Sequence, residues 1–102
     1  MAIPKGGFRL HWDEEHLTPD RHTHIHHMFQ DYANFADALD GAAIQYGMGH
    51  TLTRLENWLG EDASPIDQVM HVASHRHRRS RIEFERVKDR ETMEASPLYG
   101  TF

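Results

Sequence analysis

Hydrophobic residues recur every three or four positions over two long stretches of the chain, which is the spacing of an amphipathic helix. The first stretch follows Thr18 and Pro19, a typical N-cap residue and a proline at the first helical position, and predicts a helix over about residues 19–46. Gly47 and Gly49 end this stretch. Its apolar positions are Ile25, Met28, Phe29, Tyr32, Phe35, Ala36, Leu39, Ala43 and Tyr46.

The second long stretch begins in the same way, at Ser64 and Pro65, and predicts a helix over about residues 65–93. Its apolar stripe consists of Ile66, Val69, Met70, Ala73, His77, Phe84 and Val87. A short helix over about residues 50–59 is predicted between the two long ones, and Gly60 ends it. The inward positions of this short helix are Leu52, Leu55, Trp58 and Leu59.

These patterns predict an all-α fold, an antiparallel helical hairpin or three-helix domain over residues 18–93. Residues 1–17 are predicted to form an extended arm and residues 94–102 a tail. The last helix is longer than the short one, so Phe84 and Val87 are expected to be exposed unless a partner covers them. A chain of 102 residues has a modest core, and a homo-oligomer or a larger protein assembly is therefore expected.

Composition narrows the location and the partners. The chain has no cysteine and no apolar run of about 18 residues, and its start lacks an apolar leader, so a cytoplasmic protein without a membrane span is expected. The net charge is −5, and the basic residues gather after residue 75. An acidic body makes general nucleic-acid binding unlikely but leaves room for a local phosphate-binding patch.

Ten histidines suggest metal binding. His71 and His75, four residues apart, share a helix face with Asp67, and imidazole with carboxylate suits Zn, Mn, Fe or Ni. His22 and His26 form a second candidate group. For the first group, the alternative is a pair of solvated histidines on a polar face. For the second group, the alternative is a helix end whose imidazoles line a subunit interface.

Arginines are concentrated in residues 75–81, and their planar forks match phosphate oxygens. Arg76, Arg78 and Arg79 are therefore candidate phosphate ligands. Acidic residues follow in the same helix, so intrahelical ion pairs such as Arg79–Glu83 and Arg81–Glu85 are the alternative use of these charges.

Three stretches between residues 41 and 75 resemble small phage-type all-α dATP/dGTP diphosphohydrolase-like proteins. They are Gly41-Ala-Ala-Ile-Gln-Tyr-Gly47, Arg54-Leu-Glu-Asn-Trp-Leu-Gly-Glu-Asp62 and Asp67-Gln-Val-Met-His-Val-Ala-Ser-His75. The resemblance implies that Glu61, Asp62 and Asp67 are metal-side carboxylates and that Arg54 contacts phosphate.

Two functional hypotheses follow. The first is a metal-dependent nucleotide-binding or nucleotide-processing protein of pyrophosphohydrolase-like type, with Zn, Mn, Fe, Ni or Mg as the metal. The second is a non-enzymatic structural or adaptor subunit of an oligomeric assembly, such as a phage particle, which would place the protein in the virion. In that case the arm (residues 1–17) and the tail residues Leu98, Tyr99 and Phe102 would dock on neighbouring copies.

Overall fold

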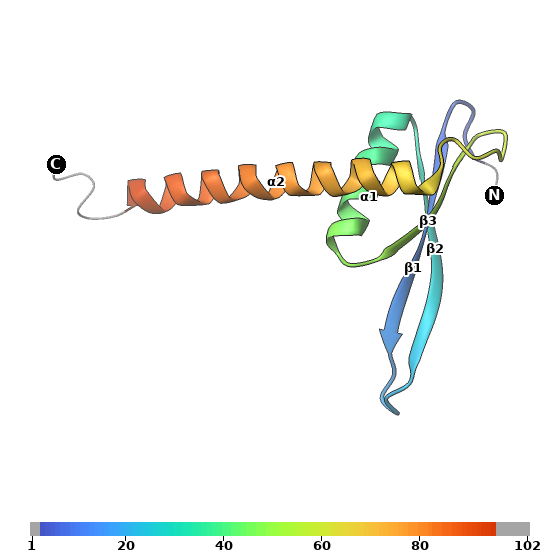
Figure 1. Ribbon diagram of the computed structural model, residues 1–102, viewed down its shortest axis with the longest axis horizontal. Helices are drawn as coiled ribbons and strands as arrows, with labels where there is room; N and C mark the ends of the chain where they lie inside the picture. The colour runs from blue at the N-terminus through green and yellow to red at the C-terminus, as the bar shows by residue number, and fades with distance from the viewer. Residues whose placement is uncertain (1–2, 96–102) are drawn as a thin grey trace.

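The computed structural model describes residues 3–95 of the chain, and the side chains of residues 3–88. It is an α+β fold in which a three-stranded antiparallel sheet packs against two helices (Figure 1). The elements are β1 (Phe8–Leu17), β2 (Thr23–Tyr32), α1 (Phe35–Gly47), β3 (Thr51–Asn57) and α2 (Ile66–Ala95). The predicted all-α hairpin or three-helix domain is therefore wrong, and two of the regions assigned to helix contain strands.

The sheet has the order β2-β1-β3, with β1 in the centre. Residues 8–17, expected as part of an extended arm, thus form the central strand. β1 pairs with β2 over its whole length, from Phe8 opposite Tyr32 to Leu17 opposite Thr23, but β3 reaches only as far as Asp13. The distal half of the β1–β2 hairpin therefore projects from the domain as a two-stranded ribbon (Figure 1).

Both helices pack on the same face of the sheet. On β1 the core residues alternate, as the period of two in a strand requires. The buried cluster joins strand residues to helix residues, and consists of Leu10, Trp12, Leu52 and Leu55 from the strands and Ala38, Leu39, Ala42, Val69 and Ala73 from the helices. No helix of the described part covers the opposite face, which we call the open face.

The region predicted as a helix over 19–46 is a hairpin turn, strand β2 and helix α1. Thr18, Pro19 and Asp20 initiate a turn, because proline at its second position fixes φ for a β-turn as well as for a helix start. The backbone N–H of Arg21 donates to the carbonyl of Thr18 (2.9 Å), and Arg21 has a left-handed φ of 66°. The helix begins only after Asn34, whose side chain accepts from the N–H of Asp37 (2.8 Å) as an N-cap.

The region predicted as a short helix over 50–59 is strand β3. Leu52 and Leu55 are both buried, although residues three apart in a regular strand face opposite ways. The register between β1 and β3 shifts at His11 and Trp12, which is the signature of a β-bulge, and the extra residue returns Leu55 to the core face. Trp58 and Leu59, predicted to face inward, are largely exposed instead.

Helix α2 runs over Ile66–Ala95, where a helix over 65–93 was predicted. It begins beside the sheet, crosses α1 and then continues alone (Figure 1). Phe84 is 68% exposed and Val87 is 54% exposed. None of the helices in the described residues is long and apolar enough to cross a membrane. Residues 94 and 95 of the predicted tail belong to α2. The rest of the tail, with Leu98, Tyr99 and Phe102, lies outside the described residues.

Candidate functional site

The first predicted metal group, Asp67, His71 and His75, lies on the first three turns of α2. The rings of His71 and His75 contact each other edge to face, with 4.5 Å between their centroids. No interaction joins Asp67 to either histidine among the described side chains. In residues 3–88, no three His, Asp or Glu side chains stand close enough together to hold a metal ion. The structure thus assembles two of the three predicted ligands.

The second predicted metal group, His22 and His26, belongs to the projecting hairpin. His22 lies in the turn near Asp20, and the ring of His26 packs against that of His16 with centroids 4.4 Å apart. Extended backbone rises about 3.3 Å per residue, so two residues four apart on a strand are separated by far more than a metal coordination sphere. The helical spacing that suggested this pair is absent.

Of the residues carried over from the resemblance, Asp67 lies on α2, whereas Arg54, Glu61 and Asp62 lie on β3 and in the loop after it. Arg54 lies on β3 and forms an ion pair with Asp62, and one guanidinium N–H also donates to the carbonyl of Gly60 (2.7 Å). The backbone N–H of Glu61 donates to the side chain of Asn57 (3.1 Å). These contacts hold the loop after β3 against the strand. The guanidinium group of Arg54 is therefore already bound by residues of its own chain.

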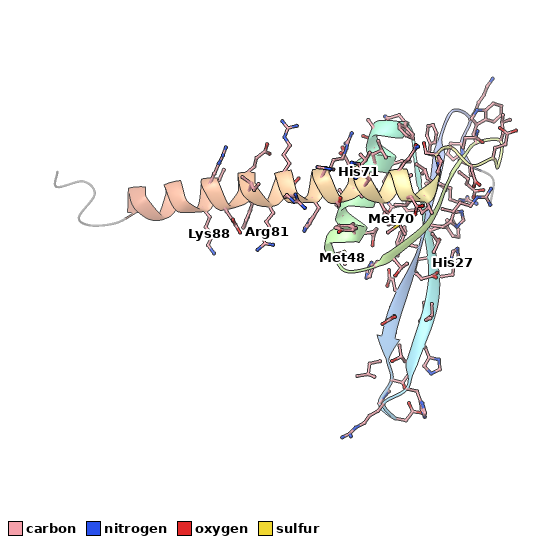
Figure 2. The ribbon with its side chains drawn as sticks, in the orientation of Figure 1. His27, Met48, Met70, His71, Arg81 and Lys88 are labelled. Atoms are coloured by element: carbon pink, nitrogen blue, oxygen red, sulfur yellow. The ribbon has the colours of Figure 1, made fainter. Side chains whose placement is uncertain are left out.

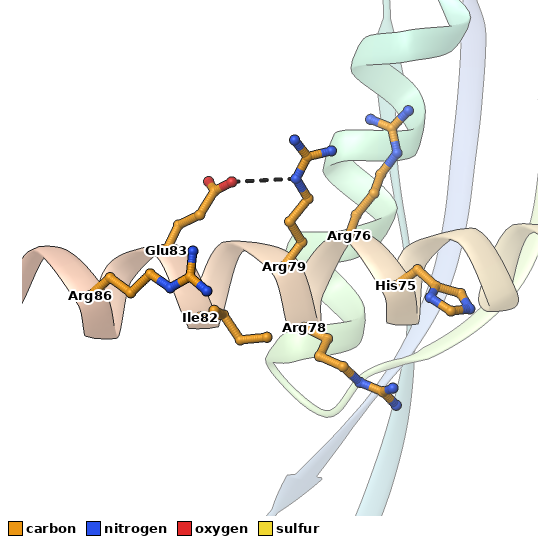
Figure 3. Close-up of a pocket in the computed structure, with 7 residues that line it drawn as sticks. All are labelled: His75, Arg76, Arg78, Arg79, Ile82, Glu83 and Arg86. Atoms are coloured by element: carbon orange, nitrogen blue, oxygen red, sulfur yellow. Dashed lines mark hydrogen bonds and ion pairs between the residues drawn. The ribbon is translucent and has the colours of Figure 1, made fainter.

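The predicted phosphate ligands Arg76, Arg78 and Arg79 lie on one stretch of α2, with Arg76 and Arg79 projecting to one side of the helix and Arg78 to the other (Figure 3). With further residues of the helix they line an open pocket of about 580 Å³, and the complete lining is His75, Arg76, Arg78, Arg79, Ile82, Glu83 and Arg86. We call this set the arginine face. Four guanidinium groups and a single carboxylate give it a strongly positive charge, which suits a phosphate-bearing ligand.

The ion pairs of the arginine face leave two of its arginines available. Arg76 pairs with Asp40 of α1, and Arg79 pairs with Glu83 one turn further along α2 (3.3 Å). Arg78 and Arg86 have no ion pair within the described side chains. A bound anion at these two groups would displace no ion-pair partner among the side chains of residues 3–88.

The opposite side of α2 carries an apolar stripe that changes from buried to exposed along the helix. Successive residues turn by about 100°, which puts Val69, Ala73, Phe84 and Val87 on one side. Val69 and Ala73 are buried against the domain, whereas Phe84 and Val87 project beyond it. Figure 2 shows this part of the helix, with Arg81 and Lys88 labelled, clear of every other element. The exposure expected from the sequence is therefore present.

The open face of the sheet carries a chain of hydrogen bonds that sequence reasoning missed. Asp13 Oδ1 lies 2.8 Å from His27 Nδ1, His27 Nε2 lies 3.1 Å from His11 Nδ1, and His11 Nε2 lies 2.6 Å from Glu56 Oε1. Asp13, His11 and Glu56 come from the paired strands β1 and β3, and His27 comes from β2. The sequence does contain a signal for this strand, because polar and apolar residues alternate along 9–13. These residues were predicted as an extended arm, so no cross-strand neighbours could be assigned to them.

Two carboxylates of the sheet, Asp31 on the open face and Glu14 on the face that carries Trp12, have pKa values below their usual range. The guanidinium of Arg9 donates two hydrogen bonds to Asp31 (2.6 and 2.9 Å), which lowers the pKa of Asp31, and it also stacks over the ring of Phe29 at 4.4 Å. The indole N–H of Trp12 lowers the pKa of Glu14 (2.7 Å). A lowered pKa in the folded state means that both contacts stabilise the fold at neutral pH and lose this effect as the pH falls.

A comparison of the chain with protein-family models, with curated protein sequences and with solved structures found no match.

Proposed function

We propose that this protein is a non-enzymatic structural or adaptor subunit that assembles with a partner through the projecting half of α2. The observation that carries the proposal is the apolar stripe of α2, which packs into the core at Val69 and Ala73 and continues into solvent at Phe84 and Val87. Such a stripe predicts a binding surface, because removing apolar area of a helix from water lowers the free energy of the protein. A subunit of this kind would belong to a cytoplasmic assembly or to a phage particle.

The size of the domain supports the same interpretation. Its fully buried large side chains are only Leu10, Leu55 and Val69 within the described residues, so the isolated core is small. Complete burial of a side chain such as Phe84 or Val87 contributes about 1.5–3 kcal/mol. Covering both residues would therefore add substantially to a stability that is small in any domain of this length.

Changing Phe84 to Glu is expected to weaken self-association or partner binding, because the substitution places a charge in the centre of the exposed stripe. The matched control is Ile82→Glu, which introduces the same charge on the opposite side of the same helix, 44% exposed in the structure. Sedimentation velocity over a range of protein concentrations measures the mass of wild type and both variants. We expect wild type and Ile82→Glu to form the same oligomer and Phe84→Glu to be shifted toward monomer by about tenfold or more in dissociation constant.

A wild-type protein that stays monomeric at every concentration, with no change on Phe84→Glu, would contradict assembly through copies of this chain. Equal weakening by both glutamate variants would also contradict the proposal, since it would assign the effect to helix charge and not to the stripe. Circular dichroism of each variant checks that α2 remains helical.

A second candidate is binding of a nucleotide through its phosphate groups, the binding half of the nucleotide hypothesis. Arg78 and Arg86, which have no ion pair among the described side chains, favour it. The proposal covers binding alone, because the described side chains include no group of three metal ligands.

Isothermal titration calorimetry with dATP, in the presence and absence of Mg²⁺, tests this candidate. Arg78→Ala and Arg86→Ala are each expected to weaken binding by about tenfold, because a charge-assisted hydrogen bond contributes about 1.5–3 kcal/mol. The control is Arg81→Ala, which removes an arginine outside the arginine face. This variant is expected to bind dATP with a dissociation constant within about twofold of the wild-type value. Absence of binding at millimolar dATP, or an equal loss in the control, would eliminate this candidate.

A further inference from the structure

The projecting hairpin exposes large apolar side chains on the open face of the sheet. Leu17 is 73% exposed, Ile25 is 68% exposed and Phe29 is 53% exposed. Cross-strand partners share a face, and Ile25 lies opposite Glu15 while Phe29 lies opposite His11, so these apolar residues stand among polar residues of β1. We call the patch formed by Asp13, Glu15, Leu17, Ile25 and Phe29 the hairpin face.

The hairpin face begins in the three-stranded part of the sheet, at Asp13 and Phe29, and continues onto the projecting two-stranded ribbon at Leu17 and Ile25. β3 ends opposite Asp13, and the helices pack on the other face of the sheet, so the ribbon beyond this point has two strands and no covering layer. A two-stranded hairpin is marginally stable in water unless a third element packs on it. An apolar patch on such a ribbon therefore predicts a partner.

The projecting half of α2 has the complementary composition. Phe84 and Val87 form its apolar stripe, and Arg81 and Lys88 lie along one border of that stripe at the helical spacing. We call these four residues the tip face. The hairpin face pairs apolar residues with the carboxylates of Asp13 and Glu15, whereas the tip face pairs apolar residues with cations.

We propose that the tip face of one copy of this chain packs on the hairpin face of a second copy. The inference rests on the proposed function and names the partner and the surface that α2 contacts. α2 is one continuous helix that leads away from its own sheet (Figure 1), so its tip face cannot cover the hairpin face of the same chain. A second copy supplies the missing layer, since a sheet is commonly covered by helices on the faces that it exposes.

The charges at the two faces favour a second copy as the occupant. Arg81 and Lys88 border the apolar stripe of the tip face, and Arg81 also pairs with Glu85 one turn along α2 (3.4 Å). On the hairpin face, Glu15 lies opposite Ile25 and has no ion pair among the described side chains. Opposite charges on the two faces attract each other, and this attraction orients the encounter.

The contact joins two different surfaces, so it is heterologous. Two copies can exchange helices reciprocally and close as a dimer, or each copy can pass its helix to the next and form a longer assembly. Both arrangements bring residue 84 of one copy to residue 25 of another, and both are covered by the same test.

Disulfide cross-linking tests the contact directly, because the chain has no cysteine of its own. Ile25→Cys and Phe84→Cys are made separately, mixed at a concentration where wild type self-associates, and oxidised. The expected product is the mixed dimer, formed at least about tenfold more than when Ile25→Cys is mixed with Ile82→Cys, since disulfides need a close approach of the two Cβ atoms. Non-reducing electrophoresis and peptide mass spectrometry identify the linked residues.

A charge exchange gives an independent measurement on the uncross-linked protein. Glu15→Arg alone and Arg81→Glu alone are each expected to weaken self-association by about tenfold, because each puts like charges in contact across the interface. The double variant restores the opposite charges and is expected to return to within about threefold of wild type. Arg79→Glu, on the arginine face, is the control and should have a smaller effect than Arg81→Glu.

The outcomes separate this inference from the proposed function. If the wild type self-associates but the 25–84 cross-link forms no better than the control and the double variant is no stronger than the single ones, the inference is overturned and the proposed function stands. If Phe84→Cys links mainly to itself, the helices pair with each other and the inference is again overturned. If the wild type is monomeric throughout, the inference fails together with the proposed assembly through copies of this chain.

Discussion

Replacing Trp12 by Ala is expected to lower the free energy of unfolding by about 3–5 kcal/mol, because the change leaves a large cavity in a small core. Trp12 is 5% exposed and lies on the central strand, where it joins residues of both helices in the buried cluster. Its indole N–H also donates to Glu14, so the truncation removes a hydrogen bond as well. Urea unfolding followed by circular dichroism measures the loss.

The matched control is Trp58→Ala, the same change at the other tryptophan. Trp58 is 43% exposed and lies just after β3, so its truncation is expected to cost about 0.5 kcal/mol or less. Similar losses for the two variants would show that residues 8–17 do not form the centre of the sheet. The contrast is therefore a test of the topology as well as of the core.

The two tryptophans also show why the sequence pattern predicts the wrong structure for β1 and β3. The pattern placed Trp58 inward with Leu52 and Leu55, and it treated Trp12 as part of an arm. A β-bulge explains the error, since an extra residue lets two leucines three apart occupy the same face of a strand and so imitates the spacing of a helix. Periodicity alone cannot distinguish a bulged strand from one and a half turns of helix.

The segment Thr18-Pro19-Asp20 is compatible with two different local structures. Threonine followed by proline and aspartate satisfies the rules for a helix N-terminus and also those for a β-turn, because both need a fixed φ of about −65° and a polar side chain that accepts a backbone hydrogen bond. The true helix start at Asn34 lacks a proline. Ser64 and Pro65, in contrast, precede a helix that the structure contains.

Local contacts of the candidate site could be predicted, and long-range contacts could not. The ion pairs Arg79–Glu83 and Arg81–Glu85 are confirmed at 3.3 and 3.4 Å, since they depend only on helical spacing. The chain of hydrogen bonds from Asp13 through His27 and His11 to Glu56 depends on which strands pair, and one sequence by itself gives no information on strand pairing. The pair Arg76–Asp40 joins two helices and was missed for the same reason.

Glycine in α1 has a packing reason that leads to a second prediction. Gly41 is buried, and a Cβ atom at this position would overlap the ring and hydroxyl of Tyr32 on β2. Gly41→Ala is therefore expected to destabilise the fold by about 1–3 kcal/mol through overpacking, although alanine in a helix is otherwise favoured over glycine by about 1 kcal/mol. Urea unfolding at neutral pH measures the change.

The same substitution in a Tyr32→Leu variant tests whether the contact with Tyr32 causes the destabilisation. Tyr32→Leu shortens the side chain that contacts residue 41, and Gly41→Ala in that background is expected to raise the free energy of unfolding by up to about 1 kcal/mol relative to Tyr32→Leu alone, because only the helix propensity remains. If Gly41→Ala is equally destabilising in both backgrounds, Tyr32 is not what limits the space. The glycine at position 41 would then need an explanation other than the close approach of α1 to β2.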